Sequence, residues 1–304
     1  MLLLLPRYGE LLLLPRRCGE VLLLPRRCGE VLLLPRRCRL HLLQRRCRKL
    51  PDCTGVPLID VDSFLRSEVT KLGEGAYARV YDVSRPGLPP VCMKLYKRQQ
   101  ATDHEDEAER LHALRNVPGL PKLVGLSLAP AAVVMTCHGT RDLHSWLCTR
   151  FNMEEYLKML LSLSTTLLAL HTEGFTHNDL KTDNVIIDER NVPTLIDVGL
   201  VSRKCARPYK CNSDKDVGEL ESRRAKRHGH LAPEIFRGGK ARPSADVYSF
   251  GRILFVASLM TFHEFVPEIA FLMTACKEVE PRKRPTFREI IELLASLIER
   301  RAQE

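Results

Sequence analysis

The chain has 304 residues and a hydrophobic content of 44%, which is enough apolar material for one large folded domain or two small ones. Its formal net charge is +10, yet residues 1–50 alone carry +9, from twelve Arg or Lys and three Glu. The rest of the chain is therefore nearly neutral, and the total charge does not support a nucleic-acid-binding role for the folded part.

The eleven cysteines follow neither a disulfide nor a metal-binding pattern. Four of them lie in the first fifty residues, the others are scattered, and no Cys-X-X-Cys pair occurs. We therefore expect reduced thiols in an intracellular, cytoplasmic protein. The longest apolar run near the start has four or five residues before a proline, whereas a bilayer-spanning helix needs roughly 20. We expect no transmembrane segment and no signal peptide.

Residues 1–40 repeat with a period of ten, and each unit contains one proline. Proline blocks a continuous helix, and the Pro-Arg-Arg-Cys-Gly part favours turns, so we expect a low-complexity, disordered tail over residues 1–50. The alternative is a basic, leucine-rich patch that touches anionic membrane or nucleic acid. A linker over residues 51–66 and a folded domain over residues 67–301 are expected to follow.

The folded part begins with strands and continues with helices. Short β-branched runs around glycines near Val69–Val83 and Val91–Leu95 predict strands joined as a hairpin. Apolar residues at helical spacing predict helices at Thr102–Arg115, Met153–His171, Ala245–Met260, Pro267–Cys276 and Thr286–Arg301. This order predicts an α+β fold with a small sheet-rich lobe and a larger helical lobe.

Two glycines, Gly73 and Gly75, lie in the run Leu72–Tyr81 between two of the predicted strands. A glycine lets backbone N–H groups come close to phosphate oxygens, where a side chain would obstruct them. Taken alone, however, such a glycine pair is more often simply a hairpin turn.

Lys94 lies in the apolar run Val91–Leu95, and a lysine in such a strand is costly unless it meets an anion. Glu105, Glu107 and Glu109 of the next predicted helix compete to supply that charge. Glu107 has leucines four and seven residues further on, where a core-facing helix needs apolar residues. We therefore select Glu107; the alternative is that all three glutamates form a solvated acidic face.

The most specific signal is the run His177–Asn184, which reads HNDLKTDN and lies between the long predicted helix and the apolar strand Val185–Ile187. Asp179 in this run is a candidate to accept a proton from a hydroxyl, and Asn184 offers a hard oxygen ligand for a cation. Asp197 follows a second apolar strand, thirteen residues after Asn184. By itself, Asp197 would be interpreted as part of an ordinary turn.

In this order, the motifs resemble those of eukaryotic-type protein kinases of the serine/threonine kind, over roughly residues 67–301. Leu231–Glu234, Asp246 and Arg284 match further positions that are structural in that family, where Arg284 would pair with Glu234. The resemblance implies the bilobal protein kinase fold. It also implies transfer of the γ-phosphate of ATP, with Mg²⁺, to serine or threonine hydroxyls of protein substrates.

The resemblance also implies a role for each site residue. The expected catalytic residues are Asp179, which orients the acceptor hydroxyl, Lys181, which neutralises charge on the γ-phosphate, and the pair Lys94 and Glu107. ATP is expected to bind at Leu72, Gly73, Gly75, Val80, Lys94, Met135 and Cys137. Mg²⁺ is expected to bind Asn184 and Asp197.

Four positions depart from the family pattern: the third glycine is Ala78, the usual Phe is Val198, the arginine before the catalytic aspartate is Asn178, and the usual threonine is Arg227. That arginine normally receives an activation-loop phosphate, so its absence predicts constitutive activity or control by partners. Arg227 weakens the expectation of serine/threonine specificity. The segment around it is strongly basic, which indicates either a solvated loop or a preference for acidic substrates.

Other classes of function compete with this interpretation. A pseudokinase that acts as a binding scaffold is the main alternative, although the chain retains Lys94, Asp179, Asn184 and Asp197. A small-molecule phosphotransferase is disfavoured because the downstream protein-kinase motifs are present. Binding of nucleic acid or of a membrane surface rests on the basic tail alone.

Overall fold

The computed structural model describes residues 55–65, 69–97, 103–149, 151–206, 228–260 and 266–303. Contacts divide the chain into two units, Met1–Lys49 and Leu50–Glu304, and every described residue belongs to the second unit. The repeat tail and the basic segment that includes Arg227 lie outside the described residues, and so do the predictions made for them. Within the described ranges, no helix combines the length and apolar character needed to cross a bilayer.

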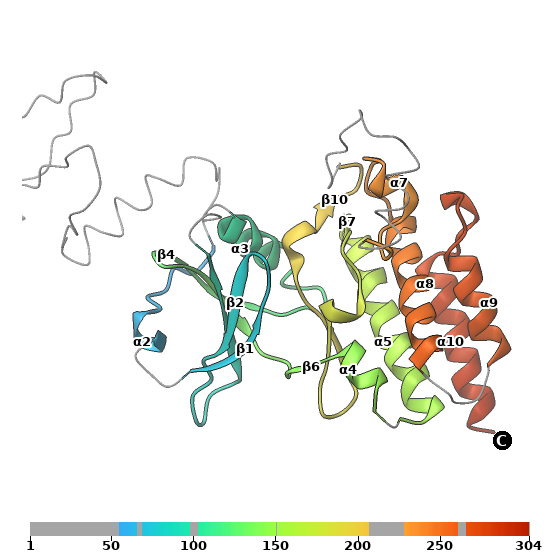
Figure 1. Ribbon diagram of the computed structural model, residues 1–304, viewed down its shortest axis with the longest axis horizontal. Helices are drawn as coiled ribbons and strands as arrows, with labels where there is room; N and C mark the ends of the chain where they lie inside the picture. Colours follow the sequence, from blue (N-terminus) through green and yellow to red (C-terminus); the bar gives the residue numbers. More distant parts are fainter. Residues whose placement is uncertain are drawn as a thin grey trace, which may run out of the picture. The chain divides into compact units, whose positions relative to one another are not determined.

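The N-terminal lobe is built on a five-stranded antiparallel sheet with the order β1-β2-β3-β5-β4 (Figure 1). Its strands are β1 Thr70–Glu74, β2 Ala78–Asp82, β3 Val91–Tyr96, β4 Leu123–Leu128 and β5 Ala131–Thr136. The helix α3, Asp103–Ala113, packs against β4 and β5. Its first turn is acidic, which suits the positive end of the helix dipole. Its buried residues, Glu107 and Leu111 among them, recur at helical spacing.

The C-terminal lobe is mainly helical (Figure 1). Its helices are α4 Leu143–Leu147, α5 Met153–Thr172, α7 Pro233–Phe236, α8 Pro243–Met260, α9 Pro267–Cys276 and α10 Phe287–Arg301. Two small sheets complete it, one with the order β6-β8-β9 and one that pairs β7 with β10. These strands are β6 Arg141–Asp142, β7 Phe175–Thr176, β8 Val185–Ile187, β9 Pro193–Leu195 and β10 Ser202–Arg203. The predicted α+β fold with two lobes is confirmed.

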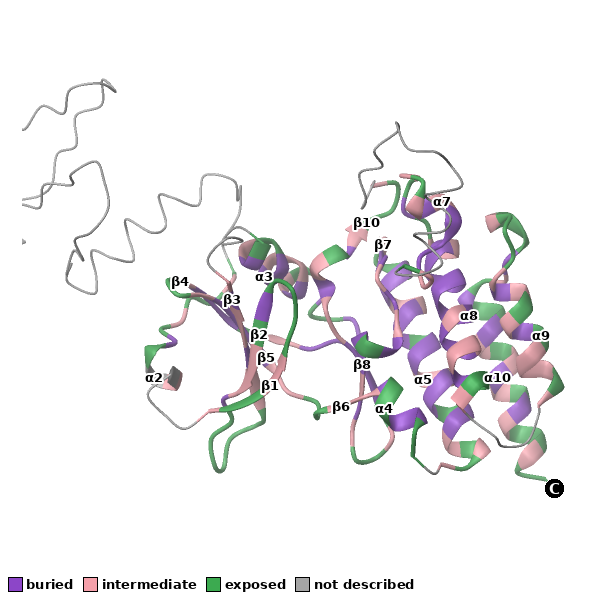
Figure 2. Ribbon diagram, viewed as in Figure 1, coloured by how far each residue is buried: buried purple, intermediate pink, exposed green. Residues whose placement is uncertain are grey.

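The long helix α5 forms the centre of the helical lobe. It starts at a capping box, in which Asn152 accepts from the backbone N–H of Glu155 and Glu155 accepts from that of Asn152. Its leucines at helical spacing are buried, and Figure 2 shows the buried positions continuing along α8. The lobe is therefore rigid where it supports the loops that follow α5.

Residues 55–61, which the sequence suggested to be part of a linker, lie along β4. Leu58 forms a parallel bridge with Leu126, and the N–H of Ile59 donates to the oxygen of Leu126 at 2.9 Å. Ile59 occupies the space beside Gly125, where an added Cβ would lie 2.4 Å from it. Val61 has no exposed surface. The packing of the N-terminal lobe therefore begins before residue 67.

Candidate active site

One face of the N-terminal sheet carries several of the residues expected to bind ATP. Lys94 of β3 is paired with Val80 of β2, which is in turn paired with Gly73 of β1. Directly opposite residues of an antiparallel pair lie on the same face, as do residues two apart on one strand. Met135 of β5 shares this face, because Lys94 is paired with Val133, two residues before it. The sheet thus brings four sequence-predicted residues together.

The packing of the described residues does not require a glycine at Gly73, near the end of β1, or at Gly75, in the turn that follows. Neither Gly73 nor Gly75 has a positive φ, and a Cβ at Gly73 would meet no atom of the described residues within 4 Å. The nearest atom to a Cβ at Gly75 is the backbone oxygen of Ala78, at 4.0 Å. The half-buried Leu72 precedes them. The interpretation of the pair as a turn requirement therefore loses support, and the space beside the glycines is open.

Lys94 is the centre of an ion-pair network. Its Nζ lies 3.0 and 2.9 Å from the two carboxylate oxygens of Glu107 and 3.0 Å from Oδ1 of Asp197. Burial by itself lowers the pKa of Lys94, but the charges of Glu107 and Asp197 outweigh burial and raise that pKa above its usual value. The lysine is therefore held as a cation between α3 and the segment after β9. The glutamate that helical phase selected is the one in contact.

Two residues that sequence reasoning missed support this network. The Tyr96 hydroxyl donates to Oε2 of Glu107, and Nη1 of Arg110 donates to the backbone oxygen of Gly199 at 2.9 Å. Tyr96 follows Lys94 by two residues and so shares its face of β3, which is the signal that could have found it. Arg110 lies one turn after Glu107, and its contact ties α3 to the turn that follows β9.

The carboxylate of Asp179 is held on both of its oxygens. Oδ2 accepts from Lys181 Nζ at 2.8 Å and from Asn184 Nδ2 at 3.0 Å, while Oδ1 lies 2.9 Å from Nε2 of His230. Burial raises the pKa of Asp179, but the hydrogen bonds from His230 and Lys181 outweigh burial and lower that pKa to about 2. Asp179 is therefore an ionised acceptor at neutral pH. His230 is 51 residues away along the chain, and no motif pointed to it.

A buried aspartate of α8 fixes the start of the loop His177–Asn184. Asp246 has no exposed surface, and it accepts the backbone N–H groups of His177 and Asn178 at 2.7 and 2.9 Å. Nε2 of His171 lies 2.8 Å from the same carboxylate. Burial raises the pKa of Asp246, but the hydrogen bond with His171 and the further contacts lower it below its usual value. The loop is thus anchored through its backbone to the helical lobe.

Asn178, which replaces the arginine of the family pattern, forms an uncharged bridge. Its φ is 67°, a left-handed conformation that asparagine adopts more readily than most residues. Its Nδ2 lies 3.1 Å from Thr176 O, 2.8 Å from Leu200 O and 3.0 Å from Ser202 Oγ. The side chain therefore joins the loop to the segment after Asp197 without a charged group.

Asn184 and Asp197 are the residues that could hold a magnesium ion. They lie at adjoining ends of β8 and β9, where the N–H of Ile196 donates to the backbone oxygen of Asn184 at 2.8 Å. Among the described residues, the amide nitrogen of Asn184 donates to Asp179, which leaves its side-chain oxygen for a cation, and Asp197 uses Oδ1 for Lys94, which leaves Oδ2. Such a donor set fits Mg²⁺, which commonly binds one or two protein oxygens plus substrate phosphates. In the described ranges no three His, Cys, Asp or Glu side chains form a closed metal site.

Cys137 lies directly after β5, at the expected adenine pocket. Its N–H donates to the oxygen of Pro90 at 2.9 Å, and the neighbouring Thr136 and His138 side chains are 2.8 Å apart. The hydrogen bond with the thiol of Cys92 lowers the pKa of Cys137. The segment Thr136–His138, which connects the two lobes, is therefore held next to the start of β3, the strand that carries Lys94.

The two partners expected downstream are in contact. Nη1 of Arg284 lies 2.6 Å from Oε1 of Glu234, and Nη2 lies 2.9 Å from Oε2, a bidentate ion pair. Arg284 is 6% exposed, so the pair is largely shielded from water. It anchors α7 to the region before α10.

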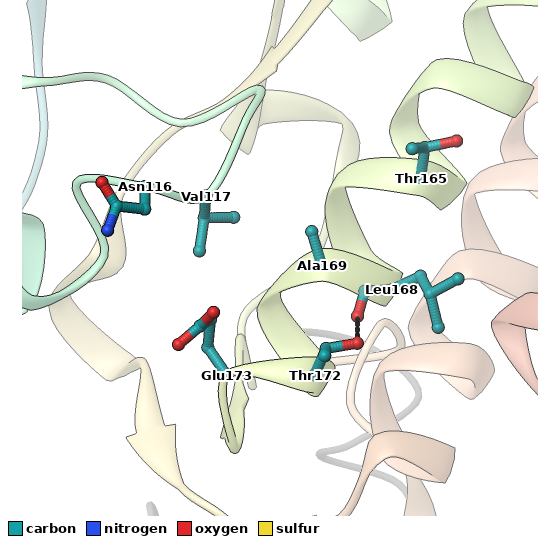
Figure 3. A pocket seen from close by; sticks show the side chains of 7 residues that line it. All are labelled: Asn116, Val117, Thr165, Leu168, Ala169, Thr172 and Glu173. Carbon is teal, nitrogen blue, oxygen red and sulfur yellow. Dashed lines mark hydrogen bonds between the residues drawn. The ribbon is translucent and has the colours of Figure 1, made fainter.

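Two hollows on the described surface lie along α5, away from these residues. The first has a volume of about 300 Å³ and includes Glu173 and Thr172, whose hydroxyl donates to the oxygen of Leu168 at 2.9 Å (Figure 3). The second, of about 490 Å³, is lined by residues that include Lys158 and Pro193. Neither includes a sequence-predicted site residue.

Comparison with known proteins identifies the class to which this fold and site belong. Residues 66–268, more than half of the chain, match the protein kinase domain family. The chain therefore belongs to the protein kinase family.

Its relatives include dual serine/threonine and tyrosine protein kinases of Gallus gallus, 28% identical over 242 residues, and of Homo sapiens and Danio rerio, each 30% identical over 199 residues. These matches cover 72% of this chain for the first and 61% for the other two. They cover 24%, 20% and 21% of the respective relatives, so the chain spans about a quarter or less of their length.

Proposed function

We propose that the chain is an ATP-dependent protein kinase. The observation that carries this proposal is the ion-pair chain from Glu107 through Lys94 to Asp197, with all contacts at 2.9 to 3.0 Å. This arrangement joins the sheet, α3 and the segment after β9 around one cation. A pseudokinase scaffold would not need to keep this half-buried cation between two acids, since holding charges away from water is costly.

The roles of the residues follow from their chemistry. Leu72, Val80, Met135 and Cys137 would enclose the adenine, and the open backbone at Gly73 and Gly75 would approach the phosphates. Lys94 would bind the α- and β-phosphates. Asn184 and Asp197 would hold Mg²⁺, which when bound neutralises charge on the phosphates.

Asp179 would orient the acceptor hydroxyl and accept its proton, and its ionised state at neutral pH suits that task. Lys181, at 2.8 Å from Asp179, would neutralise charge that develops on the transferred phosphate. Because the carboxylate, its lysine and the two candidate metal ligands come from a single hairpin and loop, their positions are set together.

We propose that serine and threonine hydroxyls of proteins are the acceptors. This proposal is based on Lys181, because a lysine two residues after the catalytic aspartate resembles the pattern of serine/threonine kinases. Tyrosine is a second candidate acceptor, because the relatives are named as dual serine/threonine and tyrosine kinases. We further propose a preference for acidic substrates. It is based on the basic residues Arg203 and Lys204 and on the basic residues of the segment 207–227, which lies outside the described residues. The tail is proposed to be dispensable for transfer, with membrane-surface or nucleic-acid contact as its alternative role.

The test is phosphate transfer by the purified full chain to a peptide library that contains Ser, Thr and Tyr acceptors. Transfer that requires Mg²⁺, ends on adding a chelator and is lost in Asp179→Ala is the expected result. Phosphoamino-acid analysis of the products then decides between the acceptor classes. Nucleotide binding without any transfer, in both forms of the protein, would instead favour the scaffold.

A further inference from the structure

The catalytic aspartate has a neighbour outside the loop that carries it. Nε2 of His230 lies 2.9 Å from Oδ1 of Asp179, and the two side chains are 18% and 14% exposed. An ionised carboxylate can only accept a hydrogen bond, so Nε2 of His230 carries the proton in this contact. The contact is therefore a donor–acceptor pair between the segment before α7 and the loop His177–Asn184.

Among the described residues, the hydrogen bonds to Asp179 leave room for one more donor on the oxygen that His230 contacts. Oδ2 already accepts from Lys181 and Asn184, whereas Oδ1 accepts from His230. An ionised carboxylate has about four acceptor positions, two on each oxygen. Oδ1 thus keeps a position for a hydroxyl, and His230 defines the direction from which that hydroxyl can come.

The backbone of His230 is fixed by the same helix that fixes the loop. The hydroxyl of Ser249 in α8 donates to the backbone oxygen of His230 at 2.6 Å, and Ser249 is only 2% exposed. Asp246, three residues earlier on α8, accepts the backbone N–H groups of His177 and Asn178. One rigid helix therefore sets both halves of the His230–Asp179 contact.

We propose that His230 is a positioning residue for phosphate transfer, a role that rests on the proposed function. Its imidazole orients the carboxylate of Asp179 so that Oδ1 faces the acceptor hydroxyl, and it couples that orientation to the fold of the segment before α7. The donor is built into the chain, so the orientation requires no added phosphate. This agrees with the loss of the phosphate-receiving arginine at Asn178.

Steady-state kinetics of His230→Ala and His230→Gln in the full chain test the role. Glutamine retains an N–H donor at a similar reach, whereas alanine has none. We expect His230→Ala to lower kcat about 10- to 100-fold with little change in the KM for ATP, and His230→Gln to recover most of the loss. His144→Ala is the control, because His144 is an exposed histidine of α4 rather than of the segment before α7.

A purely structural role would shift thermal stability and nucleotide binding together with kcat, and glutamine would not restore the rate. A His230→Ala enzyme at least as fast as wild type would also overturn the proposal, because the histidine would then only block access to Asp179. The two proposals can fail separately. If wild type transfers phosphate, Asp179→Ala does not, and His230→Ala is as active as wild type, only the role of His230 is contradicted. If wild type itself transfers no phosphate, the proposed function and this role fall together.

A second measurement tests the contact without any activity. In a ¹H–¹⁵N spectrum of the imidazoles, His230, identified by its absence in His230→Gln, is expected in the Nε2–H form. Its signals should shift in Asp179→Ala, which removes the acceptor. Unchanged His230 signals in that variant would show that the contact does not exist.

Discussion

At the scale of single residues, the position of the Lys94 ammonium depends on Glu107, and that of Glu107 depends in turn on Tyr96. The glutamate is 3% exposed, so water cannot replace the tyrosine hydroxyl without cost. Tyr96 therefore belongs to the candidate site, although among the described residues it forms no hydrogen bond with Lys94.

Tyr96→Phe removes one hydrogen bond to a buried carboxylate and keeps the ring. We expect the transfer rate to fall about 3- to 10-fold, because Glu107 then holds Lys94 less firmly. Tyr81→Phe is the control, since Tyr81 is paired with Met93 and lies on the opposite face of the sheet. Equal rates for the two variants would contradict the role given to Tyr96.

Cys137 provides a chemical probe of the adenine pocket. The hydrogen bond with Cys92 lowers the pKa of Cys137, so its reactive thiolate form is more populated at neutral pH. We expect an alkylating reagent to modify Cys137 and Mg-ATP to slow that reaction, as mass spectrometry of the peptides can show. The exposed Cys148 and Cys205 are internal controls that ATP should not protect. Unslowed modification of Cys137 would place the nucleotide elsewhere.

At the scale of elements, α8 is the support of the site, through Asp246. Asp246→Ala leaves the N–H groups of His177 and Asn178 without their acceptor, and we expect it to lower the free energy of unfolding by about 3–5 kcal/mol. Urea unfolding at neutral pH measures this difference.

The same contacts have a defined pH dependence. The pKa of Asp246 is lowered by folding, so its contribution to stability is present above its unfolded pKa and is lost as the pH falls through the folded one. The difference in unfolding free energy between wild type and Asp246→Ala should therefore shrink as the pH falls below about 4. A constant difference would mean that the ionised carboxylate is not the source of the stability.

The elements themselves were largely predictable, whereas a contact between distant segments was predictable only where family motifs supplied the pair, as for Arg284 and Glu234. Period-3.6 patterns located α9 at Pro267–Cys276 and α10 to within a residue, because each helix buries one apolar face. Helical phase selected Glu107 for the same reason, although its catalytic role stays a prediction. His230 and Asp179 meet across 51 residues, which no local pattern encodes.

At the scale of the whole molecule, the N-terminal lobe extends further toward the tail than motifs alone suggested. Residues 55–61 contain no kinase motif, but their backbone pairs with β4 and Val61 is buried completely. Their apolar residues are too few for a periodicity to be detected, which is why the sequence alone predicts a linker there.

Two truncations separate the tail from this segment. Removing residues 1–54 should leave transfer activity and thermal stability unchanged, since the proposed chemistry lies in the second unit. Removing residues 1–61 also removes the packing of Ile59 and Val61, and we expect it to lower the free energy of unfolding by about 2–5 kcal/mol. A loss of activity with the shorter truncation would contradict a dispensable tail.

In the proposed function, Asp179 serves phosphate transfer at a nucleotide site held by Lys94. The most direct measurement is transfer of labelled γ-phosphate by the full chain and by Asp179→Asn, with nucleotide affinity determined in parallel. We predict that the variant binds Mg-ATP as wild type does and transfers at least about 100-fold more slowly. Transfer at the wild-type rate by Asp179→Asn would contradict this role of Asp179.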